Sequence, residues 1–430
     1  MNKISIMLLA SIIVLSGLMT VGVQNASAVT FVEGHVTVDT TWTVADAPYV
    51  VSNDIYVDDG ATLTIEPGVE IRFGGAFNIF VDGNLSAIGT SDDEIIFTSN
   101  KLTPAPGDWN TIDFDGTGFR GAEYTSLHMK HCLVEYAEHG VTLDSWGRGD
   151  VISCDFVNNS ESGVHVMDNS NVLIKGNVLK FSKYGIKGDY VSGYISGCSI
   201  VNNKIVNNTQ YGVYVYNPYK WSDSDKITIS NNTISYNAGD GVYVYANRNV
   251  YDISISNNTI SYNAGDGVCV YADEDAYNIT ISNNAISSND GHSVYVHSTW
   301  GYSVYNITIS NNAISSNAGD GVYVHSTTGH RVYNIAISNN TISYNAGDGV
   351  CVYAEGDAYN ISISNNTISS NDGHGVYVRS TWGDSVYNIT IANNTISSND
   401  GHGVYVRADD DAYNITGKAQ HIAYTFSSAR

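Results

Sequence analysis

The C-terminal half of the chain repeats a short sequence at nearly constant intervals. Asn-Asn pairs begin at residues 231, 257, 283, 311, 339, 365 and 393, so successive pairs are 26 or 28 residues apart. A sequence close to Ile-Thr-Ile-Ser precedes each pair. Most pairs are followed by Thr-Ile-Ser, then by a glycine-containing bend, and then by Val-Tyr-Val. A fixed period of this length indicates a solenoid or a propeller. A propeller blade needs about 40 residues and four strands, so the shorter period favours a solenoid.

One repeat shows how such a coil forms. Val242 and Val244 alternate with Tyr243 and Tyr245, which gives this strand one apolar face. Ile-Ser-Ile at 253–255 repeats the alternation, and Asn at the following turn tolerates left-handed backbone angles. Stacked coils place equivalent residues about 4.8 Å apart, so buried asparagine amides can bond to those above and below. The sequence therefore predicts an all-β fold, a single-stranded right-handed parallel β-helix with three short strands per coil of 26–28 residues.

The chain divides into four segments. Residues 1–28 have the positive start, apolar stretch and Ala-Ser-Ala end of a signal peptide. Residues 29–130 are expected to form an N-terminal cap and irregular coils, 131–416 the regular repeats, and 417–430 a short tail or incomplete cap. No second apolar run of membrane-spanning length follows the signal. We expect a secreted or cell-surface protein, periplasmic in a cell with two membranes.

Charge and cysteine content narrow the functional classes. Acidic residues outnumber basic ones 43 to 19, for a formal net charge of −24. A nucleic-acid-binding protein needs a basic face instead, so nucleic acid is not an expected partner. The expected partner is a polysaccharide or cell-envelope glycan, because of the outward aromatic residues described next. The five cysteines have no Cys-x-x-Cys spacing, so the sequence predicts neither a zinc site nor a disulfide framework.

Aromatic residues alternate with the inward valines of the Val-Tyr-Val strand and so face outward. Their planes, together with two tryptophans in the longer loops, suit stacking on a sugar chain; the candidate ligand-binding residues are Trp300, Trp382, Tyr295, Tyr323, Tyr377 and Tyr405. The alternative for the tyrosines is stacking of one coil on the next, which we favour for these rows. Exposed tryptophans more often contact a ligand or partner.

Charged and imidazole side chains on the same strand are further candidates. Arg379 and Arg407 are predicted neighbours that could serve catalysis or bind an acidic glycan, although a local ion pair with Asp384 or the Asp409–Asp411 run explains them better. Two predicted imidazole pairs, His297 with His325 and His374 with His402, are metal candidates without an evident third ligand. Duplication of the repeat is the simpler explanation for both pairs. Clustered carboxylates in the bends and loops could hold calcium.

The Asn-Asn-x-Ile and Gly-Val-Tyr-Val pattern over roughly residues 130–416 resembles the parallel β-helix repeat family, which includes NosD-like proteins and carbohydrate-binding and sugar-hydrolysis domains with a pectate-lyase-like fold. Residues 60–109 also resemble the opening of exported β-helix proteins. The resemblance implies the fold and leaves activity open.

Three functional hypotheses follow. The first is a non-catalytic scaffold that binds polysaccharide or a partner, because near-identical coils offer the same face repeatedly. The second is a polysaccharide lyase, hydrolase or epimerase, for which the irregular coils between 109 and 225 are the place to build a unique site. The third, implied by the NosD resemblance, is copper handling through the histidine pairs.

Overall fold

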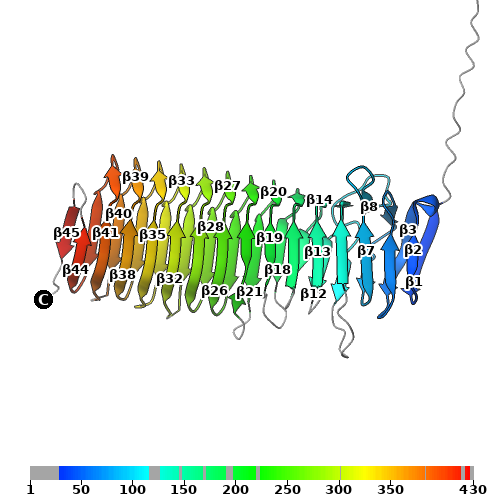
Figure 1. The fold of residues 1–430 in the computed structure, drawn as a ribbon, viewed down its shortest axis with the longest axis horizontal. Helices are drawn as coiled ribbons and strands as arrows, with labels where there is room; N and C mark the ends of the chain where they lie inside the picture. The colour runs from blue at the N-terminus through cyan, green and yellow to red at the C-terminus, as the bar shows by residue number, and fades with distance from the viewer. Residues whose placement is uncertain are drawn as a thin grey trace, which may run out of the picture.

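The strands stack into one elongated parallel β-helix. A computed structural model describes residues 29–115, 126–144, 148–167, 171–189, 197–218, 223–300, 302–382, 384–417 and 422–426. Figure 1 shows the strands side by side along the long axis, from the N-terminal end in blue to the C-terminal end in red. All paired strands run parallel, and each pairs with the equivalent strand of the next coil. The predicted β-helix with three strands per regular coil is confirmed.

Each coil contributes one strand to each of three faces. Face 1 contains β2 (Thr40–Trp42), β4 (Thr62–Ile65), β7 (Asn84–Ile88), β10 (Ser126–Lys130), β13 (Arg148–Ile152), β16 (Asn171–Lys175), β19 (Ser199–Val201), β22 (Ser224–Asp225), β23 (Thr228–Ser230), β26 (Val250–Ser256), β29 (Ala276–Ser282), β32 (Val304–Ser310), β35 (Val332–Ser338), β38 (Ala358–Ser364), β41 (Val386–Ala392) and β44 (Ala412–Gly417).

Face 2 is made of the shortest strands. It contains β5 (Glu70–Phe73), β8 (Ile95–Ser99), β11 (Cys132–Glu135), β14 (Asp155–Val157), β17 (Val178–Lys180), β20 (Lys204–Val206), β24 (Thr233–Ser235), β27 (Thr259–Ser261), β30 (Ala285–Ser287), β33 (Ala313–Ser315), β36 (Thr341–Ser343), β39 (Thr367–Ser369) and β42 (Thr395–Ser397).

Face 3 carries the Val-Tyr-Val strands. It contains β6 (Ile79–Val81), β9 (Ile112–Asp115), β12 (His139–Asp144), β15 (Ser162–Val166), β18 (Tyr184–Asp189), β21 (Val213–Asn217), β25 (Val242–Ala246), β28 (Val268–Ala272), β31 (Val294–Ser298), β34 (Val322–Ser326), β37 (Val350–Ala354), β40 (Val376–Ser380), β43 (Val404–Ala408) and β45 (Ile422–Phe426). At the N-terminal end β1 (Thr30–Val36) pairs with β3 (Tyr49–Val57), which continues into both face 2 and face 3.

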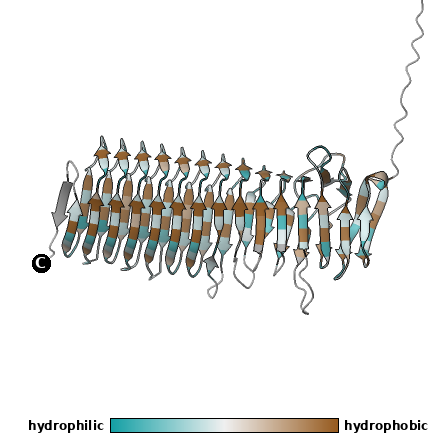
Figure 2. Cartoon of the chain, viewed as in Figure 1, coloured by the Kyte–Doolittle hydropathy of each residue, from teal (hydrophilic) through white to brown (hydrophobic). Residues whose placement is uncertain are grey.

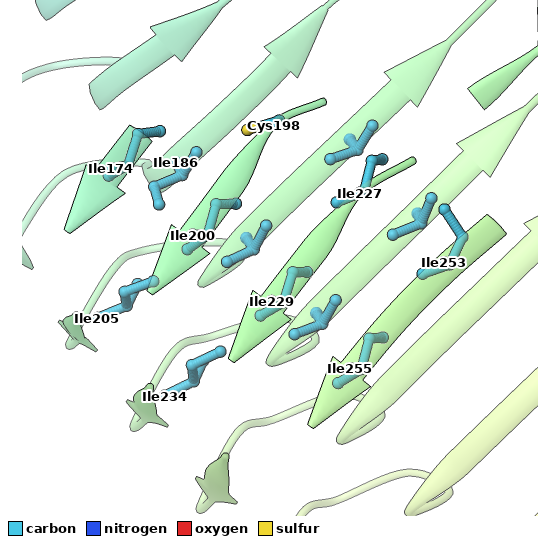
Figure 3. Close-up of a cluster of buried hydrophobic side chains, with 14 of the residues drawn as sticks. Ile174, Ile186, Cys198, Ile200, Ile205, Ile227, Ile229, Ile234, Ile253 and Ile255 are labelled. Atoms are coloured by element: carbon cyan, nitrogen blue, oxygen red, sulfur yellow. The ribbon is translucent and has the colours of Figure 1, made fainter. Parts of the chain in front are cut away.

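The core is a set of apolar columns inside the three faces. The predicted inward residues Val242, Val244, Ile255 and Ile260 are fully buried, and Ile253 is 1% exposed. Figure 3 shows isoleucines of successive coils lying one above another, and the apolar bands recur from strand to strand in Figure 2. Stacking identical side chains satisfies the close packing of a core while each coil buries the apolar edge of its neighbour.

Buried asparagines join the coils by side-chain hydrogen bonds. The Asn258 Nδ2 donates to Asn284 Oδ1 (3.0 Å) and to the carbonyl of Ile229 (2.9 Å). The Asn258 Oδ1 accepts two hydrogen bonds from Asn232, one from its Nδ2 at 3.0 Å and one from its backbone N–H at 2.8 Å. The predicted ladder therefore satisfies every polar atom of a buried amide. The first residue of each pair supplies the turn, as at Asn257 with φ of 57°.

Two further ladders were not predicted. A second buried ladder runs beside the bends, where Asn263 Nδ2 donates to Asn289 Oδ1 at 2.9 Å. An exposed one follows face 1, where Asn306 donates to Asn278 and Asn334 donates to Asn306, at 3.2 and 3.1 Å. The asparagine of the second buried ladder recurs in every repeat as the first residue of the bend sequence, and the exposed column has Asp252 in place of asparagine in one coil; a ladder was predicted only for the Asn-Asn pairs.

The ends of the chain need separate description. The predicted signal peptide, residues 1–28, lies outside the described residues. In the described part of the chain, the only helix is the three-residue η1 (Val44–Asp46), and no helix has the length and hydrophobicity needed to span a bilayer. Near the C-terminus β45 pairs in parallel with β43, which extends face 3 by one strand.

We expect Asn258→Ala to lower the free energy of unfolding by about 3 kcal/mol, because it leaves buried donors and acceptors of two neighbouring coils unpaired. Urea unfolding followed by circular dichroism measures the change. The control is Thr280→Ala, an exposed residue of face 1 in a column where another coil has Ala336. We expect the control to change stability by under about 0.5 kcal/mol. Equal effects of both substitutions would contradict the role of the ladder.

Candidate functional site

The outward side of face 3 carries two columns of side chains, and their register agrees with the prediction. Row 1 contains Tyr214, Tyr243, Cys269, Tyr295, Tyr323, Cys351, Tyr377 and Tyr405. Row 2 contains Tyr216, Tyr245, Tyr271, His297, His325, Tyr353, Arg379 and Arg407.

The tyrosines of row 1 stack on one another. The rings of Tyr295 and Tyr323 lie 5.1 Å apart at 6°, and those of Tyr377 and Tyr405 lie 5.2 Å apart at 13°. Ring faces that contact the next coil leave ring edges and hydroxyl groups for a ligand. These four candidate residues therefore stack on the tyrosines of neighbouring coils, which is the alternative that the sequence favoured over stacking on a sugar chain.

Trp300 and Trp382 are in a different position. Their side chains are 77% and 74% exposed, in the loops that follow β31 and β40. They occupy equivalent places three coils apart, about 14 Å along the axis at the usual strand spacing. Thr328 holds the same place in one intervening coil and shares their left-handed backbone, with φ of 62°. Large exposed aromatic side chains at a regular spacing are suited to bind a repeating ligand.

Arg379 and Arg407 are paired in register, as predicted, but their partners differ. Arg407 Nη2 lies 3.7 Å from Asp409 Oδ1, which is the expected local ion pair. The Arg379 guanidinium lies over the ring of Tyr353 at 5.2 Å, and its buried Nε has no hydrogen-bond partner among the described residues. Arg379 therefore keeps donor capacity for an anionic ligand.

The two histidine pairs are stacked, as their register predicted. His297 and His325 lie 4.8 Å apart at 2°, and His374 and His402 lie 5.3 Å apart at 2°. In both pairs the ring planes are parallel, so the nitrogen lone pairs run side by side and do not converge on one ion. Burial lowers the pKa of His297 to about 4 and that of His325 to about 3. These imidazoles are neutral at pH 7.

A different group of titratable residues occupies the N-terminal half of face 3, in the irregular coils. We call His139, His165, Tyr184, Lys187 and Asp189 the titratable cluster. Strands β12, β15 and β18 carry it. The rings of His139 and His165 stack at 4.3 Å, and His139 Nδ1 lies 2.8 Å from the hydroxyl of Ser162.

Charges of both signs meet inside the titratable cluster. Asp189 Oδ2 lies 2.5 Å from Lys187 Nζ and 3.5 Å from His165 Nε2. Burial alone would raise the pKa of Asp189, but the neighbouring His165 and Lys187 outweigh it and lower that pKa. Burial, reinforced by the charges of His165 and Lys187, lowers the pKa of His139 to about 3. The cluster thus places two stacked imidazoles beside an ammonium–carboxylate pair, which are residue types that take part in acid–base chemistry.

The titratable cluster continues the outward columns of the regular coils. His165 pairs with Lys187 in register, and Lys187 pairs with Tyr214, the first residue of row 1. A ligand lying along face 3 would therefore contact the cluster and the aromatic rows together. Sequence analysis identified these coils only by their irregularity, because without a repeat to align it could not say which side chains share a column.

Side chains at one position of the bends that lead into face 3 form a further column. It contains Asp240, Asp266, His292, Asp320, Asp348, His374 and His402. Every side chain of the column except that of His402, the last, accepts a hydrogen bond from the backbone N–H of the next bend, as Asp240 Oδ1 does from Asp266 at 2.6 Å. Asp240, Asp266 and Cys269 form the only group of three or more candidate metal ligands within the described residues.

Comparison with known proteins agrees with this architecture. The family model "Right handed beta helix region" matches residues 196–381 and 275–419, together more than half of the chain. "Periplasmic copper-binding protein (NosD)" matches residues 87–275, and "Pectate-lyase like beta helix domain" matches residues 34–121. A curated relative, Protein bark beetle of Drosophila melanogaster, is 41% identical over 59 residues, which is 14% of this chain and 2% of that protein.

Solved structures share the fold at low sequence identity. The periplasmic alginate epimerase AlgG aligns with a TM-score of 0.52 and 14% identity, over 82% of this chain and 84% of that one. The A-module of the mannuronan C-5 epimerase AlgE4 of Azotobacter vinelandii aligns with a TM-score of 0.44 and 17% identity, over 84% and 91%. At 14% identity the likeness to AlgG concerns the fold alone.

The copper named for the NosD family was tested against the donor atoms present. Copper(I) prefers thiolate, thioether and imidazole ligands. The stacked histidines do not converge, and the Asp240, Asp266 and Cys269 group supplies one sulfur beside two hard carboxylates. These residues fit a borderline ion better than copper(I).

We expect the double substitution His297→Tyr and His325→Tyr to reduce acid destabilisation. A folded-state pKa below the unfolded value of about 6.5 means that stability is complete above pH 6.5 and falls as the pH drops toward 4. At pH 4 the variant should lose less stability than the parent, by an order of 2 kcal/mol per imidazole.

Unfolding curves at pH 7 and pH 4 measure this difference. Tyrosine fits the column, because Tyr271 and Tyr353 occupy row 2 in adjacent coils. Identical pH dependence of parent and variant would show that burial does not lower the pKa of these imidazoles relative to the unfolded chain, and would contradict the prediction.

Proposed function

Because this chain belongs to the family of right-handed β-helix proteins, we propose that it is an exported protein that binds a polysaccharide along face 3. The carrying observation is the pair of exposed tryptophans, Trp300 and Trp382, in equivalent loops beside rows 1 and 2. A polymer presents the same unit at intervals, and a stack of coils presents the same contacts at intervals. Several weak contacts along one chain then add up to avid binding.

The rows between the two tryptophans support the same proposal. Tyr295 and Tyr323 of row 1 offer half-buried ring edges, and their hydroxyl groups are held above their usual pKa by burial and therefore stay protonated. Arg379, three residues before Trp382 in the chain, adds a guanidinium group in row 2. Hydroxyl and guanidinium groups can bond the hydroxyls and carboxylates of a glycan, while the indoles contact its apolar faces.

We expect the protein to co-sediment with at least one member of a panel of neutral and acidic polysaccharides, tested with and without calcium because acidic loops remain calcium candidates. Replacing both tryptophans by threonine, the residue at the equivalent position 328, should weaken binding about tenfold or more, which corresponds to about 1.4 kcal/mol. Titration calorimetry against the retained polymer measures this.

The matched control is Tyr236→Ser with Tyr262→Ser. These tyrosines are 58% and 54% exposed, stack at 5.0 Å between faces 2 and 3, and have serine at the equivalent places Ser288 and Ser316. This control should bind like the parent. If both double variants lose the same affinity for the polymer, or if the tryptophan variant loses none, the loops that carry Trp300 and Trp382 are not part of the binding site.

A second candidate function is catalysis on the bound polymer by the titratable cluster. The supporting observation is the unique set formed by His139, His165 and the Lys187–Asp189 pair, in contrast to the repeated columns beside it. The imidazole of His165, next to Asp189, can remove a proton next to a carboxylate group of the polymer, and the ammonium group of Lys187 can stabilise the charge that develops there. This chemistry corresponds to a lyase or epimerase acting on a uronate polymer.

If the cluster is catalytic, His165→Gln and Lys187→Met should each lower the turnover rate by about 10² to 10⁴. Product sizing detects cleavage, and measurement of uronate composition by NMR detects epimerisation without cleavage. The control is Lys204→Met, an exposed lysine of face 2. Unmodified polymer in every assay would leave the protein as a binding scaffold.

A further inference from the structure

We propose that Asp240, Asp266 and Cys269 form a binding site for one divalent cation of the zinc type, at the bend side of face 3. One carboxylate oxygen from each aspartate and the Cys269 Sγ all lie within 4.8 Å of one another. A tetrahedral zinc site places its oxygen and sulfur ligands about 3 to 4 Å apart. Small side-chain rotations would therefore bring the three atoms onto one ion, with a fourth position for water.

The backbone holds both carboxylates in place. Asp240 Oδ1 accepts the N–H of Asp266 at 2.6 Å, and Asp266 Oδ1 accepts the N–H of His292 at 2.5 Å. Each aspartate therefore keeps its second oxygen for a ligand. Hydrogen bonds that orient ligating carboxylates are a regular part of metal sites.

The thiol is the independent observation that points to an ion. Cys269 is only 6% exposed and makes no hydrogen bond with any described residue. Row 1 has tyrosine in the coils before and after it, at Tyr243 and Tyr295, so the thiol interrupts the column of rings at the place where the two carboxylates lie.

The electrostatics of the three groups also favour a cation. The Cys269 thiol is buried, the two carboxylates are half-buried, and all three groups lie together at the bends. Buried acidic groups so close together are stable as anions only with a positive charge among them. Thiolate beside carboxylate selects a borderline ion such as zinc over calcium, which takes oxygen ligands.

The chain contains a near copy of this arrangement that serves as an internal comparison. Asp320, Asp348 and Cys351 hold the equivalent positions three coils later. There the three ligand atoms do not all lie within 4.8 Å of one another, as they do in the first set. The proposal therefore assigns the ion to the first set, with Cys351 as the matched control.

The test uses the purified protein in a thiol-free reductant, titrated with Zn²⁺ in competition with a chromophoric chelator and, separately, with Co²⁺. We expect one tight Zn²⁺ per chain, and with Co²⁺ a thiolate-to-cobalt charge-transfer band in the near ultraviolet. Cys269→Ser should abolish the band and weaken Zn²⁺ binding by about 100-fold. Cys351→Ser should leave both unchanged.

Cys269→Tyr restores the residue that other coils have in row 1 and should fold like the parent while losing the site. Circular dichroism checks the fold of all three variants. Absence of the cobalt band in the parent, its persistence in Cys269→Ser, or its equal loss in Cys351→Ser would each overturn the proposal. Polysaccharide binding is measured in parallel, so failure of this site is distinguished from failure of the proposed function.

Discussion

The whole molecule depends on one interaction, the stacking of each coil on an almost identical coil in fixed register. Parallel pairing sets the spacing, and a slip by one residue would turn every apolar side chain of a strand to the opposite side. The asparagine ladders work against such a slip, because Asn258 reaches both Asn232 and Asn284 only when the three coils are aligned. Their amides lie inside the stack, where an unpaired group would be costly.

This register also decides what the outer surface can do. Side chains at one position of the repeat become a column, so a single substitution in one coil changes one point of a continuous surface. Row 1 is a column of stacked tyrosines except at Cys269 and Cys351, and row 2 changes from tyrosine to histidine and then arginine. Repetition therefore supplies a regular surface, and departures from repetition supply the chemistry.

The departures fall into three groups along face 3. The titratable cluster occupies the irregular coils, the Asp240, Asp266 and Cys269 group lies at the bends of the regular coils, and Trp300 and Trp382 project from the opposite loops. A polymer along this face would meet all three in sequence. The proposed polysaccharide-binding residues and the proposed acid–base cluster thus share one face of the β-helix.

The sequence by itself determined the fold, the three strands of each regular coil, the inward columns and the pairing of Tyr295 with Tyr323 or Arg379 with Arg407, because a fixed period places equivalent residues one strand apart. It also indicated that the irregular coils could hold a unique site. Only the tertiary structure decided that His139, His165, Lys187 and Asp189 meet there, since those coils differ in length and have no common repeat that fixes their alignment. The tertiary structure likewise decided that the histidine pairs stack without converging on one point, and that the thiol of Cys269 lies close to two carboxylates. The direction of a side chain relative to the neighbouring coils depends on packing, which the period of the repeat does not specify.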